Sequence, residues 1–411
     1  MMHLPRRWKT FGWDNGRVPL GIYISVPFCR TKCTFCNFAS DVFSRVRFDA
    51  YVDRVCADIA RSAETAHDMA SRIDREVDSI YLGGGTPTVL DPAQLQRIFA
   101  AVRSQFNVMS DCEITVECAP GTLTPEILDA LQRCGVNRVS LGVQSFVDVE
   151  AASVGRLHTR AITHDDIARL RAAGIANINI DLIAGLPHQT EESWQQSLDD
   201  TIATSVPHAS VYMLEVDDES RLGRELIAGG TRYHAHFVPD DDATADFYSI
   251  ACERLNAAGI TQYEISNFAR AGFESIHNLK YWTRQPYLGF GVDAHSMLIS
   301  RNLEAVRFST TDSLEQFVAG APLTRTEIPI AAAFEESFFL GLRLNRGVDL
   351  RDIAEKFGCD AVAQVFPTIK QLESDGLLDA TQNVIRLTPR GRLLSNEVFQ
   401  SFLASPVSTQ R

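Results

Sequence analysis

Residues 21–38 read G-I-Y-I-S-V-P-F-C-R-T-K-C-T-F-C-N-F, an apolar run that leads directly into a loop with three cysteines. Cys29, Cys33 and Cys36 follow the spacing C-x3-C-x2-C. Three thiolates so spaced can bind three irons of a cubane iron–sulfur cluster and leave the fourth iron open to a small molecule. The stretch therefore predicts a strand followed by a ligand-binding [4Fe-4S] cluster.

Two other kinds of cysteine site compete with this prediction. Structural zinc usually takes four ligands as two pairs from separate segments, and the sequence has no second C-x2-C. A thioredoxin-like redox pair would not need Cys29. An odd total of nine cysteines in a large chain does not favour a disulfide framework. The remaining cysteines are expected to be structural: Cys56, Cys112, Cys118, Cys134, Cys252 and Cys359.

Strand-like and helix-like segments alternate on the C-terminal side of the cysteine loop. Expected strands are Gly21–Phe28, Val77–Leu82, Glu113–Glu117, Arg138–Val143, Asn177–Leu182 and Ala209–Glu215. Expected helices between them are Phe48–Ala63, Pro92–Ser104, Pro125–Cys134, His164–Ala173 and Glu191–Thr204. This βα rhythm predicts an α/β fold with a parallel sheet closed, or partly closed, into a (β/α) barrel.

Polar or glycine-rich segments follow the strands. They are Cys29–Cys36, Gly83–Pro87, Glu117–Pro120, Gln144–Phe146 and Asp181–Pro187. The carboxyl ends of parallel strands meet at one face of a barrel, where such folds hold their active sites. We therefore expect these segments to converge on one mouth.

The character of the sequence changes near its C-terminal end. Expected helices are Ala332–Leu342, Leu350–Phe357 and Ala361–Asp375, and a hairpin through Val384–Leu387 follows them. This is a mainly helical, winged-helix-like pattern, but its acidic and basic residues nearly balance, so a packing role is favoured over DNA binding. We expect an N-terminal extension over 1–17, a barrel over 18–300, a linker over 301–325 and a C-terminal domain over 326–411.

Charge and hydropathy exclude several classes of protein. A formal net charge of -13 argues against general nucleic-acid binding, which needs a basic surface. No stretch is long and apolar enough to span a bilayer, and the first residues lack the apolar core of a signal sequence. We expect a cytoplasmic protein that is not integral to a membrane, and loose attachment to a membrane partner stays open.

Residues Tyr81–Thr88 read Y-L-G-G-G-T-P-T, a second unusual stretch at the end of a strand. Consecutive glycines let the backbone approach a ligand closely. Together with C-x3-C-x2-C, this loop resembles the radical SAM superfamily, in which S-adenosylmethionine chelates the open iron of [4Fe-4S]. Several longer motifs resemble the oxygen-independent coproporphyrinogen III oxidase family: Y-I-S-V-P-F-C, E-C-A-P, L-G-V-Q-S-F, I-D-L-I-A-G-L-P-H-Q-T and Y-E-I-S-N-F-A-R. This resemblance implies a partial radical SAM barrel with a HemN-type C-terminal domain.

The resemblance also implies the residues that hold S-adenosylmethionine. They are Tyr23, Phe35, Gly84, Gly85, Thr86, Glu117, Gln144, Arg156 and Asp181. Glu117 would accept from the amino group, and Asp181 would bind the ribose hydroxyls. The chemistry agrees, because a zwitterionic sulfonium ligand needs carboxylates, an arginine and exposed backbone polar groups.

Two features resemble the heme chaperone group of this family, called HemW, more than the oxidases. The oxidase pattern places a further cysteine two residues after Cys36, where this sequence has Phe38. His277–Trp282 reads H-N-L-K-Y-W and matches the H-N-x-x-Y-W motif of the chaperones. The resemblance implies heme as cargo, with His277 as a candidate iron ligand and Tyr281 and Trp282 packing on the porphyrin.

Three functions follow from these resemblances. The first is a heme chaperone that delivers heme to an acceptor protein, with the cluster and S-adenosylmethionine serving assembly or regulation. The second is an enzyme that removes hydrogen and CO2 from the propionates of coproporphyrinogen III. The third is a radical methyltransferase. Phe38 and the motif at His277 favour the first, so we do not expect an active coproporphyrinogen III oxidase. Two further features stay open. His295 follows a Gly-rich stretch and is a candidate for the cavity lining, and His234 with His236 could bind a metal but are more simply solvated.

Overall fold

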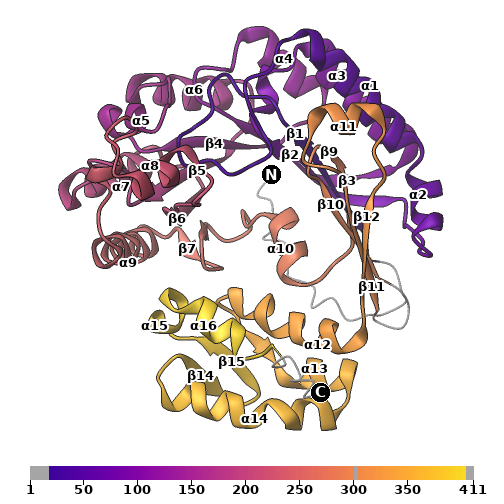
Figure 1. The fold of residues 1–411 in the computed structure, drawn as a ribbon, viewed down its shortest axis with the longest axis vertical. Coiled ribbons are helices and arrows are strands. Elements are labelled where there is room, and N and C mark those ends of the chain that lie inside the picture. Colours follow the sequence, from indigo (N-terminus) through magenta and orange to yellow (C-terminus); the bar gives the residue numbers. More distant parts are fainter. Residues whose placement is uncertain (1–17, 300–303, 404–411) are drawn as a thin grey trace.

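Six parallel strands form the centre of one large sheet in the computed structural model, which describes residues 18–299 and 304–403 (Figure 1). They are β1 (Leu20–Val26), β2 (Glu76–Gly84), β3 (Asn107–Cys118), β4 (Arg138–Gln144), β5 (Asn177–Ala184) and β6 (His208–Met213). They pair side by side in chain order, all parallel. All six expected strands are confirmed. β3 begins at Asn107 rather than at the expected Glu113, and the other strand ends differ from the expected ones by at most two residues.

The helices between these strands cover the outer face of the sheet (Figure 1). They are α1 (Val46–Ala60), α2 (Ser62–Asp68), α3 (Pro92–Gln105), α4 (Pro125–Arg133), α5 (Asp148–Ser153), α6 (Arg160–Ala172) and α7 (Glu191–Ala203). Two more helices, α8 (Arg221–Ala228) and α9 (Asp241–Ala257), follow β6. Their starts are set locally. Asp91 caps α3 in a capping box with Gln94, and Thr124 caps α4, each before a proline in the first turn. All five expected helices are present, whereas the short α2 and α5 were not expected.

Side chains alternate between the two faces of the central strands. On β1, Ile22 and Ile24 are fully buried in the main core, whereas Tyr23 lies half-buried on the other face. On β4, Val139 and Leu141 belong to the same core, and Ser140 between them bonds to a polar side chain of β5. Because successive side chains of a strand point to opposite faces, every second residue is available to the inner face. The predicted carboxylates lie on that face.

Further strands extend both edges of the central sheet without closing it. The order is β12-β11-β10-β9-β1-β2-β3-β4-β5-β6-β8-β7. The added strands are β7 (Thr261–Gln262), β8 (Asn267–Ala269), β9 (Tyr287–Gly291), β10 (His295–Ile299), β11 (Ala305–Ser309) and β12 (Thr324–Ile328). β9 is parallel to β1, and the others are antiparallel to their neighbours. The barrel is therefore partial.

The segment expected as a linker contains regular structure. From residue 304 onward, residues 301–325 hold β11, helix α11 (Leu314–Ala319) and the start of β12. Phe308 and Phe317 from this segment belong to the main core. This part of the chain belongs to the large sheet, because β11 and β12 pair in it and its apolar side chains are buried in the main core.

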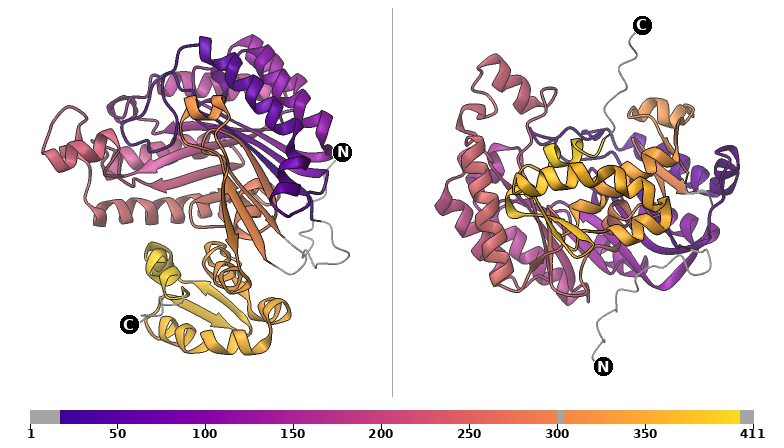
Figure 2. Two further views of the ribbon diagram at one scale, coloured as in Figure 1. Left: turned by 45° about the vertical axis from the view of Figure 1, so that its right-hand side comes forward. Right: turned by 90° about the horizontal axis from the view of Figure 1, so that it is seen from below.

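A second, smaller core lies below the large sheet (Figures 1 and 2). It is formed by α12 (Ile330–Phe339), α13 (Leu350–Phe357), α14 (Cys359–Ser374), α15 (Pro389–Leu393) and α16 (Ser395–Gln400), with β13 (Val348–Asp349), β14 (Leu378–Thr381) and β15 (Val384–Leu387). The three expected helices and the hairpin are confirmed. Phe338 anchors this core by stacking on Phe402. The limits of the two domains stay a prediction.

Helix α10 (Ile276–Trp282) lies between the sheet and the C-terminal helices (Figure 1). The Glu113 carboxylate accepts from the backbone N–H of Ile276 at 3.1 Å and of His277 at 3.2 Å. A carboxylate at a helix N-terminus satisfies free donors and opposes the helix dipole. This contact fixes α10 against the inner face of the sheet. Among the described residues, no helix has the length and apolar composition required to cross a membrane.

Candidate functional site

The cysteine loop follows β1 and is held at its base by the backbone. Cys29 N–H donates to Asp41 O at 3.0 Å, and Asp41 N–H donates to Pro27 O at 2.9 Å. Phe28 is fully buried and stacks on Phe48 at 3.9 Å between ring centroids. The loop therefore leaves the sheet at a fixed point, with its three thiols free of disulfides and partly exposed.

The three thiols lie close enough to influence one another. Burial raises the pKa of Cys29, and the charges of Cys36 and Cys33 add to this effect. Burial also raises the pKa of Cys33, while the Arg156 guanidinium lowers it. Cluster iron would remove this penalty, because a metal-bound thiol is deprotonated. No three metal-binding side chains in the described residues already surround a point for a single ion. Ligands of a cubane need not do so, since each thiolate binds a different iron.

The glycine loop after β2 packs directly against the cysteine loop. Gly85 N–H donates to Val26 O at 2.7 Å, and Thr86 N–H donates to Phe28 O at 2.8 Å. A Cβ on Gly85 would lie 2.7 Å from Phe28 O and 3.1 Å from Cys29 Sγ. Only glycine allows this approach, so Gly85 is explained by the neighbouring loop. Thr86 Oγ1 lies 3.9 Å from Cys29 Sγ.

Glu117, at the end of β3, lies over the same glycine loop. It accepts from Tyr81 Oη at 2.8 Å and from Gly84 N–H at 3.1 Å. A Cβ on Gly83 would lie 2.8 Å from its carboxylate. Burial, and then the nearby Asp181 carboxylate, raise the pKa of Glu117 to about 7. A cationic ligand would relieve this repulsion and favour the ionised form.

Gln144, Arg156 and Asp181 complete the mouth of the sheet. The side chains of the first two meet over Gly142, where a Cβ would lie 3.1 Å from both Gln144 Nε2 and Arg156 Nη2. Gln144 has a left-handed backbone with φ 68°, uncommon for a residue with a side chain. Arg156 Nε is buried and has no protein partner within the described residues. An unpaired guanidinium N–H is a donor available to a ligand carboxylate.

Asp181 is already bound by neighbouring side chains. It accepts from Ser140 Oγ at 2.9 Å and from Asn179 Nδ2 at 2.7 Å, and burial raises its pKa. The mouth thus offers carboxylates and a guanidinium beside the glycine loop. This donor set fits the amino-acid end of S-adenosylmethionine, and the three thiols beside it fit an iron–sulfur cluster.

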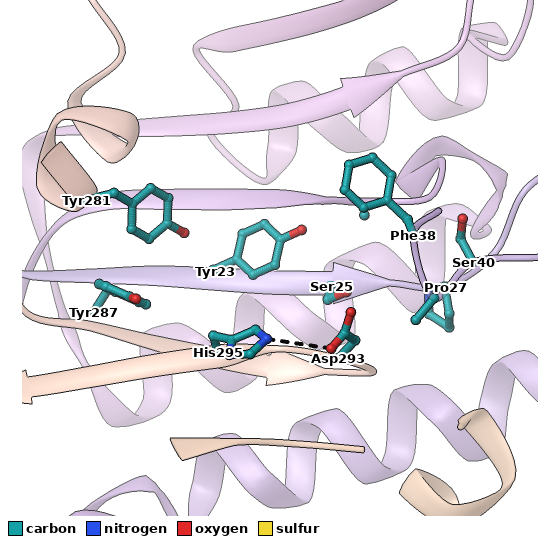
Figure 3. Close-up of a pocket in the computed structure, with 11 residues that line it drawn as sticks. Tyr23, Ser25, Pro27, Phe38, Ser40, Tyr281, Tyr287, Asp293 and His295 are labelled. Atoms are coloured by element: carbon teal, nitrogen blue, oxygen red, sulfur yellow. Dashed lines mark ion pairs between the residues drawn. The ribbon is translucent and has the colours of Figure 1, made fainter. Parts of the chain in front are cut away.

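A cavity of about 290 Å³ opens beside the cysteine and glycine loops (Figure 3). Aromatic rings line much of it: Tyr23 from β1, Tyr281 from α10, Tyr287 from β9 and Phe38 from the cysteine loop. The other lining residues are Ser25, Pro27, Ala39, Ser40, Gly84, Asp293 and His295. Phe38 is 62% exposed although it is a large apolar side chain. The cavity therefore joins the cluster loop to the H-N-L-K-Y-W helix.

His277 lies beneath this cavity and is not among its lining residues. It is 1% exposed; its Nδ1 is 3.0 Å from Ser79 Oγ, and its Nε2 is 2.9 Å from Tyr281 Oη. Burial, then the charges of Lys280 and Arg138, lower its pKa to about 3, so the imidazole is neutral. Both ring nitrogens are engaged. Ligation of heme iron by His277 stays a prediction, but it requires one of these two hydrogen bonds to break.

Phe35 and Trp282 also lie outside the cavity lining. Phe35 packs against an apolar cluster of Val154, Ile183 and Leu186. Trp282 contacts the C-terminal region, where the Arg343 guanidinium lies 4.3 Å from its ring centroid. Trp282 therefore needs a ligand that extends beyond the cavity, or a movement, to contact it.

Sequence reasoning missed Ser25, Tyr287 and Asp293 as residues of the cavity. Tyr287 and Asp293 come from β9 and from the turn after it, which no expected element included. The signal was present in G-F-G-V-D-A-H, residues 289–295, where the glycines mark close backbone approach. His295 was expected to line the cavity, and it does.

Three further histidines, His188, His234 and His236, form a separate patch, called the histidine patch. His188 Nε2 lies 3.0 Å from His234 Nδ1, and both rings lie near Phe237, with His236 on its other side. His236 is exposed, as expected, whereas His234 is hydrogen-bonded to His188 instead of being simply solvated. This histidine patch contributes nothing to the cavity lining.

Two family models match separate parts of the chain. Residues 23–201 match the Radical SAM superfamily, and residues 331–394 match the HemN C-terminal domain. Heme chaperone HemW of Bacillus subtilis is 35% identical over 386 residues, which are 93% of this chain and 98% of that protein. Heme chaperone HemW of Escherichia coli is 31% identical over 94% of this chain and 98% of that protein.

A solved structure shares the fold over nearly the whole length. It is coproporphyrinogen III oxidase (HemN) from Escherichia coli, described as a radical SAM enzyme, with a TM-score of 0.78 and 25% identity. The match covers 93% of this chain and 90% of that one. The fold expected from the sequence, a partial radical SAM barrel with a mainly helical C-terminal region, is confirmed.

Proposed function

The chain belongs to the heme chaperone HemW family of radical SAM proteins, and we propose from this premise that it binds heme and passes it to a heme-accepting protein. The family membership rests on relatives that are 30–35% identical over nearly the full chain. The observation in the site that supports the proposal best is Phe38. Its exposed ring borders an aromatic cavity at the position where the related oxidases have a further cysteine.

We assign the cluster to Cys29, Cys33 and Cys36. When bound, the cluster supplies an electron donor and an iron with an open coordination position. The chain's own contribution is to hold the loop between β1 and the glycine loop through Gly85 and Thr86. Free thiols at these positions require a reducing compartment, which supports a cytoplasmic location.

We assign S-adenosylmethionine to the mouth beside that loop. Glu117 would accept from the ligand's amino group, and the free Arg156 Nε would donate to its carboxylate. Gly84, Gln144 and Asp181 lie on the same face and would complete the contacts, with Tyr23, Gly85 and Thr86 nearby. Phe35 remains a less direct contact because it is packed in an apolar cluster.

We assign the heme to the aromatic cavity. Porphyrins are flat and apolar in the ring, and aromatic side chains bind such faces by stacking. Tyr281 is the member of the H-N-L-K-Y-W helix that lines the cavity, so it is the direct heme contact of that motif in this proposal. His277 supports Tyr281 through its hydrogen bond. Trp282 would join on rearrangement of the C-terminal region.

The test is an anaerobic titration of the protein carrying its reconstituted cluster with hemin, followed by absorbance in the Soret region. We expect saturation at about one heme per chain. Addition of apomyoglobin as a probe acceptor should then move the heme, with a shift to the myoglobin spectrum. Failure to bind hemin would overturn the proposal.

A second incubation separates this function from the oxidase and the methyltransferase. The reduced protein, coproporphyrinogen III and S-adenosylmethionine are mixed without oxygen, and the porphyrins are analysed by mass spectrometry. The chaperone function predicts unchanged coproporphyrinogen. Protoporphyrinogen IX would identify an oxidase, and a methylated porphyrin would identify a methyltransferase.

A further inference from the structure

We propose that the Ser40 hydroxyl donates a hydrogen bond to the thiolates of the bound cluster and thereby raises its reduction potential. The inference rests on the cluster assigned to Cys29, Cys33 and Cys36. It deepens that assignment, because it names a residue that adjusts the cluster without binding iron. The potential decides which reductants can deliver an electron to the cluster, and hydrogen bonds to the sulfurs are among the factors that set it.

Ser40 lies within reach of two of the three cysteines. Its Oγ is 3.9 Å from Cys36 Sγ. Its hydroxyl also reaches Cys29, since burial raises the pKa of that thiol and a hydrogen bond from Ser40 lowers it. The third thiol, Cys33, lies instead beside the Arg156 guanidinium. Ser40 is therefore placed to serve Cys29 and Cys36.

The Ser40 side chain is buried, and its hydroxyl depends on sulfur for a protein partner. The residue is 3% exposed. Among the described residues, the groups to which this hydroxyl is hydrogen-bonded are sulfurs of the cluster cysteines. A thiol sulfur is a weak acceptor, so the protein alone satisfies the hydroxyl poorly. An iron-bound thiolate has no proton, so the hydroxyl can only donate to it, and the negative charge on sulfur strengthens the bond.

The backbone fixes Ser40 at the end of the cysteine loop. Ser40 N–H donates to Phe38 O at 2.7 Å, and the residue after Ser40 is bonded through both backbone groups to the chain that follows β1. The sulfur side is also held, because Cys36 N–H donates to Cys33 O at 3.3 Å. Figure 3 shows Ser40 beside Pro27, at the end of the cavity where Phe38 lies. The hydroxyl is thus in place before the cluster is assembled.

The effect on the potential follows from charge. One electron from a reductant such as dithionite converts a [4Fe-4S] cluster from its 2+ to its 1+ state, and no covalent bond forms or breaks. The added negative charge is shared by the sulfurs, so a hydroxyl that donates to them stabilises the reduced state more than the oxidised state. Removal of the hydroxyl should therefore make the cluster harder to reduce. Because Ser40 acts through the thiolates, it is a positioning residue and not a catalytic one.

The test is a spectroelectrochemical titration of the full chain with its reconstituted cluster, in the absence of S-adenosylmethionine and heme. In Ser40→Ala the equilibrium constant for reduction should fall about tenfold, which lowers the midpoint potential by about 59 mV for one electron. Ser40→Thr keeps the hydroxyl and should stay near the wild-type potential. Ser25→Ala is the matched control and should keep that potential, because this buried serine lines the same cavity but its hydroxyl bonds to Tyr23. Iron and sulfide content shows that each variant carries the cluster.

A second measurement detects the hydrogen bond itself. After exchange into deuterium oxide, pulsed electron paramagnetic resonance of the reduced wild-type cluster should show a coupled deuteron that is absent from the Ser40→Ala spectrum. An unchanged potential in Ser40→Ala, or equal shifts in Ser40→Ala and Ser40→Thr, would overturn the inference and leave the cluster assignment intact. Absence of iron and sulfide from reconstituted wild type would overturn that assignment itself.

Discussion

Two polar layers lie on the inner face of the sheet, and the upper one contains a buried arginine N–H that has no partner within the described residues. The mouth layer comprises the three cluster cysteines, Glu117, Gln144, Arg156 and Asp181. The floor layer comprises Asp78, Glu113, His208, His277 and Lys280. In the floor, His277 and His208 have both nitrogens bonded, and Lys280 Nζ lies 2.7 Å from Asp78 Oδ1. In the mouth, Arg156 Nε has no partner.

This difference separates groups that hold the fold from groups that await a ligand. A buried polar group without a partner costs stability, so it persists where a ligand supplies the partner. A satisfied buried network positions backbone elements, as Glu113 does for α10. Both layers contain residues of the kinds that catalyse or bind, so residue type alone does not distinguish them. The missing partner singles out Arg156, whereas Glu117 and Asp181 of the mouth are hydrogen-bonded like the floor residues.

The largest effect is expected from Cys33→Ala in the mouth. Two remaining thiolates cannot hold the cubane, so the broad visible absorbance of the reconstituted cluster and its iron and sulfide should be lost. The apoprotein should melt at the wild-type temperature, because the Cys33 side chain makes no bond on which the fold depends. Cys359→Ala, an exposed cysteine on α14, is the control and should keep the cluster. Unchanged iron and sulfide in Cys33→Ala would refute the cluster assignment.

Among these variants, Lys280→Ala should give the largest loss of stability, because it removes the buried ion pair of the floor layer. The ammonium is 1% exposed, pairs with Asp78 and donates to Pro19 O at 2.8 Å. Removing one partner of a buried pair leaves the other charge uncompensated, at a cost of about 3–5 kcal/mol in the free energy of unfolding. Urea denaturation measures this loss. Lys370→Ala, on the exposed face of α14, should stay within about 0.5 kcal/mol of wild type.

Glu117 should make the stability of the ligand-free protein depend on pH. Its pKa is about 7 in the folded protein against 4.5 as the ordinary value, mainly because of burial. Between these values the folded state binds more protons, so stability falls as the pH rises, by up to about 3 kcal/mol. Glu117→Gln should remove this part of the slope, whereas the exposed Glu373→Gln should not. Identical slopes of stability against pH in wild type, Glu117→Gln and Glu373→Gln would show that the Glu117 carboxyl does not titrate between pH 4.5 and about 7.

Arg156→Met should have the smallest effect on stability and a clear effect on binding. Because Arg156 Nε has no protein partner within the described residues, the free energy of unfolding should stay within about 0.5 kcal/mol of wild type. Affinity for S-adenosylmethionine, measured by anaerobic equilibrium dialysis, should fall about tenfold through loss of a charged hydrogen bond. Arg325→Met on β12 should alter neither quantity. A large loss of stability in Arg156→Met would place this residue with the floor layer.

Local patterns predicted the fold closely because each element depends mainly on its own residues. The strands around Ile22 and Ile180 were recognisable as short apolar runs, and α3 and α4 were marked by a capping residue before a proline. The linker was not predicted well, since β11 and β12 are stabilised by pairing with β10 and with each other. Pairing between distant segments leaves a weak local signal.

Motifs predicted which residues gather at the mouth but not what each one contacts. Cys29–Cys36 and Tyr81–Thr88 lie side by side, as two loops at the carboxyl ends of adjacent parallel strands must. His277 was a candidate iron ligand by its motif, yet the structure buries it. Whether an imidazole is free depends on which side chains from other strands meet it, here Ser79 and Tyr281.

The sequence by itself determined the cysteine spacing, the order of strands and helices and the alternation of side chains along each strand, because these are properties of neighbouring residues. Only the tertiary structure decided which polar groups have partners. That division depends on β2, β3, β9 and α10 meeting on one face, from positions as far apart as Ser79 and His277. The same assembly brought His295 and Asp293 to the cavity that begins at the cysteine loop, since the turn that carries them is anchored on β1.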